Sequence, residues 1–125
     1  MFFIGKAGGI MLYDRGDPVG WDFSLPAIVT DGDAHDMDLS GIIPAGTVAV
    51  LLNVYVQDNT DMSAISFRKK GNSNWVNISS PICQVTMVFN CQDIIVFCDS
   101  NGVIEYKTAN TTFSFIDVVV KGWFI

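Results

Sequence analysis

The 125-residue sequence predicts an all-β domain, an eight-stranded β-sandwich of the jelly-roll type with an irregular N-terminal arm. Short segments rich in β-branched and aromatic residues alternate apolar and polar positions with a period of two, which is typical of half-buried strands. Turn signals separate these segments at a spacing of roughly 8–12 residues. No apolar period of about 3.6 residues persists over about eleven residues, so no helix is predicted.

The irregular arm is expected to cover residues 1–23, and the sandwich domain residues 24–125. Glycine is frequent in the arm, as at Gly8, Gly9 and Gly16, and glycine loses more backbone freedom on ordering than any other residue. Acidic residues also concentrate in the first part of the chain. We expect the arm to become ordered when it binds a partner, by adding a strand to an exposed sheet edge.

Eight segments are expected to form the strands. The clearest begins at Thr47, because apolar residues at every second position from Val48 to Val56 share one face, with Asn53 and Tyr55 opposite. The expected strands cover residues 25–30, 47–57, 63–68, 76–78, 83–89, 94–98, 103–107 and 113–125.

Two neighbouring features in the second half of the chain are informative. Residues 94–98 form an uninterrupted apolar run, which predicts a strand buried on both faces. Residues 99–102 read Asp-Ser-Asn-Gly and are the strongest turn signal, because Asn-Gly tolerates the positive φ of a tight hairpin.

The last expected strand has apolar side chains on both faces. One face is expected to reach the core, through Ile116, Val118, Val120 and Phe124. The opposite face is expected to contribute to a contact between subunits, through Phe113, Phe115, Val119, Trp123 and Ile125.

Charge and hydropathy narrow the classes of partner. Thirteen acidic residues against seven basic ones give a net charge of -6, which argues against nucleic-acid binding because such proteins normally present a basic face. No apolar stretch approaches the about 20 residues of a spanning helix, and the start of the chain lacks a signal-peptide pattern. A mean hydropathy of +0.37 predicts apolar surface that is buried between subunits.

The sequence assembles no catalytic constellation, so we expect a non-enzymatic protein with no catalytic, cofactor-binding or metal-binding residues. His35 is the only histidine and Glu105 the only glutamate, whereas acid–base and nucleophilic catalysis need paired groups. Residues 31–38 combine aspartates with His35 and are a candidate cation loop. A polar turn is the favoured interpretation, because a calcium loop ends on a glutamate and this position is Ile42. A carboxylate pair of the glycosidase type is the enzymatic alternative.

Cysteine and tryptophan residues are expected to have structural roles. Three cysteines, whose spacing matches no zinc or redox motif, are expected to be buried reduced thiols: Cys83, Cys91 and Cys98. Three tryptophans are expected in the core or at an interface, in preference to a sugar-stacking platform: Trp21, Trp75 and Trp123.

Three stretches of the chain resemble small virion proteins of tailed bacteriophages. They are residues 36–47 (DMDLSGIIPAGT), 65–74 (ISFRKKGNSN) and 116–125 (IDVVVKGWFI), and the similarity covers residues 25–125. The resemblance implies a β-sandwich or jelly-roll module, usually a homotrimer, that serves as a head decoration (cement) protein, a head fibre or part of a tail fibre. The closing stretch also resembles the last strand of trimeric tumour-necrosis-factor-like and C1q-like jelly rolls. No catalytic residues come with either resemblance.

The expected function is therefore that of a bacteriophage virion structural protein, a trimeric capsid decoration (cement) protein that binds the outer capsid surface and stabilises the head. Its expected partners are two further copies of itself and the major capsid protein or other virion proteins, without nucleic acid, membrane or cofactor. We expect synthesis in the host cytoplasm and a final location on the capsid exterior.

The alternative is a head-fibre or tail-fibre module that recognises a glycan or protein on the host surface. Such a module would bind through exposed loops, and three are candidates: residues 58–61, 69–74 and 108–111.

Overall fold

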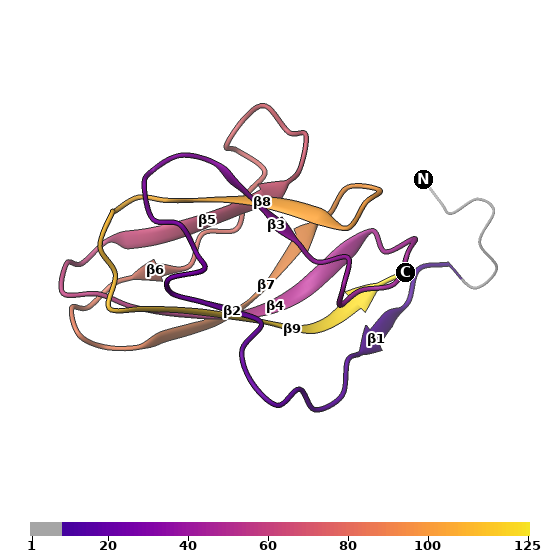
Figure 1. Cartoon of the computed structure of the whole chain (residues 1–125), viewed down its shortest axis with the longest axis horizontal. Helices are drawn as coiled ribbons and strands as arrows, with labels where there is room; N and C mark the ends of the chain where they lie inside the picture. Colours follow the sequence, from indigo (N-terminus) through magenta and orange to yellow (C-terminus); the bar gives the residue numbers. More distant parts are fainter. Residues whose placement is uncertain (1–8) are drawn as a thin grey trace.

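The computed structural model describes residues 9–125, which form two antiparallel β-sheets packed face to face (Figure 1). No helix occurs within this range, so the predicted all-β sandwich is confirmed. The nine strands are β1 (Leu12–Asp14), β2 (Phe23–Ser24), β3 (His35–Asp38), β4 (Ala49–Gln57), β5 (Ser63–Lys69), β6 (Ile82–Cys83), β7 (Asn90–Phe97), β8 (Val103–Thr108) and β9 (Phe115–Phe124).

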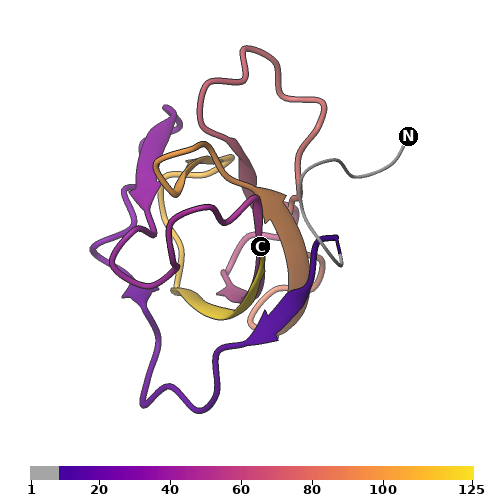
Figure 2. The same ribbon diagram turned by 90° about the vertical axis from the view of Figure 1, so that its right-hand side faces the viewer.

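The two sheets have different strand orders. One contains β1-β9-β4-β7, with β2 also paired to β9, and the other contains β3-β8-β5-β6. All pairings between these strands are antiparallel. Strands β4 and β5, β7 and β8, and β8 and β9 are consecutive in the chain but lie in different sheets, so these connections cross from one layer to the other. Figure 2 shows the two layers end-on.

The core lies between the sheets and is formed by alternate residues of the long strands. From β4 and β9 it receives seven side chains that are fully buried: Val50, Leu52, Val54, Val56, Ile116, Val118 and Val120. From β5 and β8 it receives Ile65, Phe67, Ile104 and Tyr106. Alternation with a period of two is therefore confirmed in the segments where it was clearest.

A β-bulge in β9 reverses the predicted orientation of its last residues. Leu52 pairs with Val120 and Leu51 pairs with Gly122, so the intervening Lys121 has no partner on β4. Beyond the bulge, Trp123 packs against the core, whereas Phe124 lies opposite Ala49 at the outer side of the sheet. The predictions that Phe124 faces the core and Trp123 faces outward are therefore wrong. Phe113, also expected on the outer face, packs against the core as well.

Several expected strands are shorter than predicted or absent. Residues 25–30 form a turn in which Ile28 donates its backbone N–H to Ser24 and buries its side chain between the sheets. Residues 76–78 form no strand, and only the adjacent Ser79 bridges to β5. In the segment 83–89 the pairing ends at Cys83, because Met87 adopts a positive φ of 62° and donates its N–H to the Asp58 carbonyl.

Strand β7 is longer and more exposed than the sequence predicted. It begins at Asn90, and its outward residues Ile95 and Phe97 are 51% and 53% exposed, so burial on both faces is wrong. The expected Asp-Ser-Asn-Gly turn follows it, but β7 and β8 on either side of this turn lie in different sheets and do not pair, so the expected hairpin is wrong. Gly102 has a φ of 76° there, and the Asp99 carboxylate accepts the N–H groups of Asn101 and Val103.

The N-terminal arm is only partly irregular. Residues 1–8 of the expected arm lie outside the described residues, whereas β1 and β2 pair with the two halves of β9. Both strands are short, but they occupy the edge that β9 would otherwise leave open. Residues 12–14 and residue 23 of the expected arm thus belong to the five-stranded sheet, and residues 15–22 form the loop between β1 and β2.

Gly122 is the point at which β1 approaches β9 most closely. A Cβ atom at this position would collide with the carbonyl oxygen of Tyr13, which is backbone and cannot move without displacing β1. We expect Gly122→Ala to destabilise the protein by about 1–3 kcal/mol in urea unfolding. Gly20→Ala is the matched control, because a Cβ at Gly20 meets no atom within 4 Å. Equal stability of the two variants would show that β1 contributes nothing at this contact.

Candidate interaction surface

The side of the five-stranded sheet that faces away from the core carries a continuous set of side chains from five strands or their flanking loops. We call it the outer sheet face. Its two ends are mainly apolar and its middle is polar, and the Asp117 carboxylate, which accepts from the Ser24 hydroxyl at 2.6 Å, lies opposite Tyr55 at the aromatic end. It consists of Ile10, Trp21, Val48, Ala49, Leu51, Asn53, Tyr55, Phe89, Cys91, Asp93, Ile95, Phe97, Phe115, Asp117, Val119, Lys121 and Phe124.

One end of the outer sheet face is a row of four aromatic rings. Trp21 lies 4.8 Å from Tyr55, Tyr55 lies 5.7 Å from Phe89, and Phe89 lies 5.3 Å from Phe115, measured between ring centroids. These spacings and the tilted planes are those of favourable aromatic pairs. Trp21, Phe89 and Phe115 are each between 41% and 49% exposed. The row therefore presents apolar area to solvent while its rings hold one another in place.

An ion pair positions Trp21 at the end of this row. The Arg15 guanidinium donates to both carboxylate oxygens of Asp22, at 2.5 and 3.0 Å. Asp22 also accepts the N–H of Val120, and Arg15 donates to the Val120 carbonyl, both within 3.1 Å. These two side chains hydrogen-bond the backbone groups of Val120, which lies on the edge of β9 between the parts that pair with β1 and β2. They also hold together the two ends of the loop that carries Trp21.

The middle of the outer sheet face is a polar cluster drawn from three strands. The Asn53 side-chain amide of β4 donates to Asp93 of β7 at 2.7 Å, and Lys121 of β9 donates to the other oxygen of Asp93 at 2.8 Å. The hydrogen bond from Asn53, followed by that from Lys121, lowers the pKa of Asp93. Every charge in this cluster has a partner within the subunit, so a contact that covered it would not leave a charge unpaired.

The other end of the outer sheet face is an apolar hollow of about 190 Å³. Its lining comes from the described N-terminus, the strands β4, β7 and β9, and the residue preceding β4: Ile10, Val48, Ala49, Ile95, Phe97 and Phe124. Ile95 and Phe97 belong to the run that the sequence predicted to be buried. Contiguous apolar surface of this kind is characteristic of a site that binds another surface.

The opposite sheet has a different exterior, in which charges pair within the subunit. Arg68 of β5 donates to Glu105 of β8 at 2.7 Å, and Lys70 lies 2.8 Å from Asp36 of β3. The hydrogen bonds to Asp36 and Glu105 raise the pKa of Lys70. The Trp75 ring lies against the Arg68 guanidinium at 3.9 Å. Trp75 is therefore engaged by a cation of its own subunit and is not a free stacking platform.

The aspartate-rich segment forms a turn that leads into β3. His35 Nε2 lies 2.7 Å from the Asp31 carboxylate, and the same oxygen accepts the N–H of Asp33. The hydrogen bond with His35 lowers the pKa of Asp31. Within residues 9–125 no group of three or more histidine, cysteine, aspartate or glutamate residues is arranged to hold a metal ion.

Two of the three candidate loops lie together, and the third lies elsewhere. Asn110, in the loop 108–111, donates to Asp58 at 2.7 Å, and Asp58 also accepts from Ser63. Asp58 is only 1% exposed, so it joins the loops and is not available to a ligand. The loop 69–74 follows the far end of β5, and the three loops therefore do not form one site.

The cysteines depart from the expectation of three buried thiols. Cys83 and Cys98 are buried, and burial raises the pKa of Cys98. Cys91 is exposed in the polar cluster of the outer sheet face, where its sulfur lies 3.2 Å from the side-chain nitrogen of Asn53. Its exposure follows from the period-two alternation of β7, which places Cys91 on the same side as Ile95 and Phe97.

No protein-family model matches the chain, and a search of curated proteins finds no match. Among residues 9–125 there is also no helix long and apolar enough to cross a membrane. The fold and the outer sheet face are accordingly the observations from which a function can be inferred.

The Arg15–Asp22 pair should stabilise the loop beneath the aromatic row. Asp22→Ala leaves the guanidinium and the Val120 N–H without their acceptor, and we expect a loss of about 1–3 kcal/mol in urea unfolding. The Val120 amide should also exchange faster with deuterium. Asp17→Ala removes a carboxylate from the same loop, where Asp17 is exposed, and should change neither quantity. Slow exchange of Val120 in Asp22→Ala would contradict this role.

Proposed function

We propose that this chain is a non-enzymatic structural protein of a bacteriophage virion, and that it acts as a trimeric decoration protein on the outer surface of the capsid. The proposed partners are further copies of the chain and the major capsid protein. The proposal combines the resemblance of three stretches of the sequence to small phage virion proteins with the surface properties of the folded domain.

The outer sheet face is the observation that carries the proposal. Phe89, Phe115, Ile95 and Phe97 are each about half exposed on a single sheet, although burying one such side chain is worth roughly 1.5–3 kcal/mol. A charged cluster that is already internally paired separates the two apolar ends. We infer that contact with a neighbouring subunit covers this face, because association buries the apolar ends without breaking the polar cluster.

The strand order supports a jelly-roll form of the sandwich. Apart from the short β1, each sheet has four strands, and several consecutive strands alternate between the layers. Two antiparallel four-stranded sheets joined in this way are typical of the double Greek key, an architecture used by viral capsid and lectin domains. The architecture by itself fits many functions, so it supports the proposal only together with the outer sheet face and the resemblance.

Receptor recognition by a fibre is the second candidate function. It is favoured by the end of the sandwich at which Asp58, Ser63 and Asn110 hold two loops together through buried hydrogen bonds. A rigid loop pair of this kind is a suitable support for a binding site. The number of copies of the chain per virion distinguishes the two candidate functions.

Self-association through the outer sheet face can be tested with one substitution. Phe115→Lys places a charge in the aromatic row without disturbing the core, because Phe115 is 48% exposed. We expect wild-type protein to be trimeric by light scattering and Phe115→Lys to be monomeric. Val76→Lys makes the same kind of change at a residue outside this face that is 85% exposed, and it should remain trimeric. A monomeric wild-type protein would refute the proposed association.

Cys91 provides an independent readout of the same contact. It is the only one of the three cysteines that is exposed, so a maleimide should react with this thiol in the folded protein. We expect Cys91 to react slowly in the wild-type trimer and faster in Phe115→Lys. Equal rates in wild type and Phe115→Lys would show that the contact does not cover the middle of the outer sheet face.

The number of copies in the virion tests the location. Quantitative mass spectrometry of purified particles should give a copy number that scales with that of the major shell protein. A copy number in line with the few fibres of a particle would replace decoration by the receptor-binding candidate. Absence of the chain from purified particles would overturn both.

A further inference from the structure

The five-stranded sheet ends differently on its two sides. On one side, β1, β2 and the Arg15–Asp22 pair occupy the edge of β9. On the other side β7 pairs only with β4, so its second edge faces away from the sheet. Edge strands of this kind accept an additional strand, because their outward backbone N–H and C=O groups have no partner in the sheet.

Two hydrogen bonds show which backbone groups of β7 lie on this edge. Cys98, directly after β7, donates its backbone N–H to Val48, so the even-numbered residues direct their backbone toward β4. Ser79 donates its hydroxyl to the Ile95 carbonyl from the opposite side, so the odd-numbered residues face outward. Among residues 9–125, the N–H groups of Ile95 and Phe97 meet no hydrogen-bond acceptor. Two residues of a strand span about 6.8 Å, so this pair of donors has the repeat of an incoming strand.

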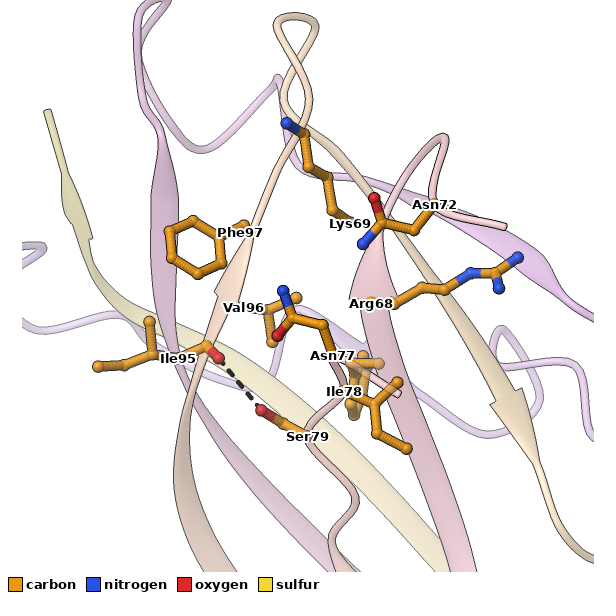
Figure 3. Close-up of a pocket in the computed structure, with 10 residues that line it drawn as sticks. Arg68, Lys69, Asn72, Asn77, Ile78, Ser79, Ile95, Val96 and Phe97 are labelled. Carbon is orange, nitrogen blue, oxygen red and sulfur yellow. Dashed lines mark hydrogen bonds between the residues drawn. The ribbon is translucent and has the colours of Figure 1, made fainter. Parts of the chain in front are cut away.

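A groove runs beside this edge. It has a volume of about 280 Å³ and lies between β7, the end of β5 and the segment that precedes β6. Figure 3 shows Ser79 joined to Ile95 at one end of the groove and Asn77 between the two strands. Lys69 and Asn72 lie at the other end. Hydroxyl, amide and ammonium groups therefore follow one another along the groove, parallel to the free backbone groups of β7.

A second hollow continues the groove past the end of β7. It has a volume of about 380 Å³ and shares Lys69 and Phe97 with the first. The rest of its lining comes from residues 46–48 and 98–100. Together the two hollows follow the backbone from Ile95 to Ser100. This length suits an extended segment of about six residues.

Lys69 gives the groove a positive charge that has no carboxylate partner within residues 9–125. Its side chain is exposed and takes part in none of the ion pairs of this range. Asp99 lines the second hollow, but its carboxylate accepts the N–H groups of Asn101 and Val103. On a chain with a net charge of -6, the groove is thus a local site that favours a carboxylate from outside.

We propose that the β7 edge and this groove bind an extended acidic segment of another protein, which adds to the five-stranded sheet as a further strand. The backbone carbonyls of the segment accept the N–H groups of Ile95 and Phe97, and one of its carboxylates accepts from Lys69. Asn72 and Asn77 offer further side-chain donors along the same line. The proposal goes beyond the proposed function and does not depend on it.

Two variants of Ile95 test the backbone part of the site. Ile95→Pro removes the outward N–H and places a ring in the path of an added strand, a change that edge strands tolerate. Ile95→Ala also shortens the side chain but keeps the N–H. A surface-display library of random ten-residue peptides is depleted on Ile95→Pro and then selected on the wild-type protein. We expect the selected peptides to bind Ile95→Ala at least about tenfold more tightly than Ile95→Pro.

Variants of Lys69 test the chemistry of the bound segment. We expect the selected peptides to be enriched in aspartate and glutamate, because Lys69 is the cation that lines the groove beside β7. Their affinity should fall about tenfold in Lys69→Gln and be restored in Lys69→Arg, which keeps the positive charge.

Amide hydrogen exchange of the full-length protein locates the bound peptide. Without peptide, we expect the Ile95 and Phe97 amides to exchange fast. A saturating concentration of a selected peptide should slow both at least about tenfold, because the carbonyls of the added strand accept these N–H groups. The Val96 amide, which faces β4, should remain protected in wild type and in every variant, and it thereby reports an intact sheet.

Several results would overturn the proposal. One is a library from which no peptide survives depletion on Ile95→Pro, and another is a selected peptide that binds Lys69→Gln as tightly as wild type. Slow exchange of Ile95 and Phe97 in wild type without peptide, at every protein concentration, would show that this edge is already covered within the chain. Slow exchange that appears only as the protein concentration rises would assign the edge to a second copy. The measurements are repeated with Phe115→Lys, so that peptide binding is tested even if self-association through the outer sheet face fails.

Discussion

The antiparallel pairing of β4 with β9 is the constraint on which the rest of the molecule depends. It joins the clearest strand of the sequence to the last one, across the 57 residues that separate β4 from β9 in the chain, and it runs through the centre of the five-stranded sheet. Its inner side supplies the largest part of the core, from Val50 to Val120. On its outer side, Tyr55 lies in the middle of the aromatic row, and Asn53 belongs to the polar cluster. Core and candidate surface are thus two faces of one pairing.

The period-two pattern was sufficient to predict the strands that contribute a full face to the core. Residues 47–57 and 63–68 have this pattern, and each corresponds to an observed strand. The pattern failed where burial does not accompany regular pairing. Ile28 is buried from a turn, and β3 is a strand with only one buried residue, Met37, among its four. Local hydropathy predicts burial, whereas pairing also depends on which edge is available.

The candidate surface was less accessible to prediction from sequence. Phe115 and Val119 were correctly expected on the outer face of the last strand, because they precede the bulge. Trp123 was not, because a single extra residue at Lys121 inverts all positions that follow it. The aromatic row could not be predicted at all, since Trp21, Tyr55, Phe89 and Phe115 meet only when strands and loops distant in sequence become neighbours.

The Arg15–Asp22 pair has a consequence for how many molecules can join edge to edge. It divides the edge of β9 between two strands of three and two residues, which are too short to template a further strand. The sheet can therefore be extended on the β7 side alone. Strand addition that is possible on only one side ends after a single step, because each new member offers no second edge. As far as residues 9–125 are concerned, the five-stranded sheet consequently cannot grow into an open-ended fibre by strand addition, and a larger assembly through this sheet would use side-chain contacts on its outer face.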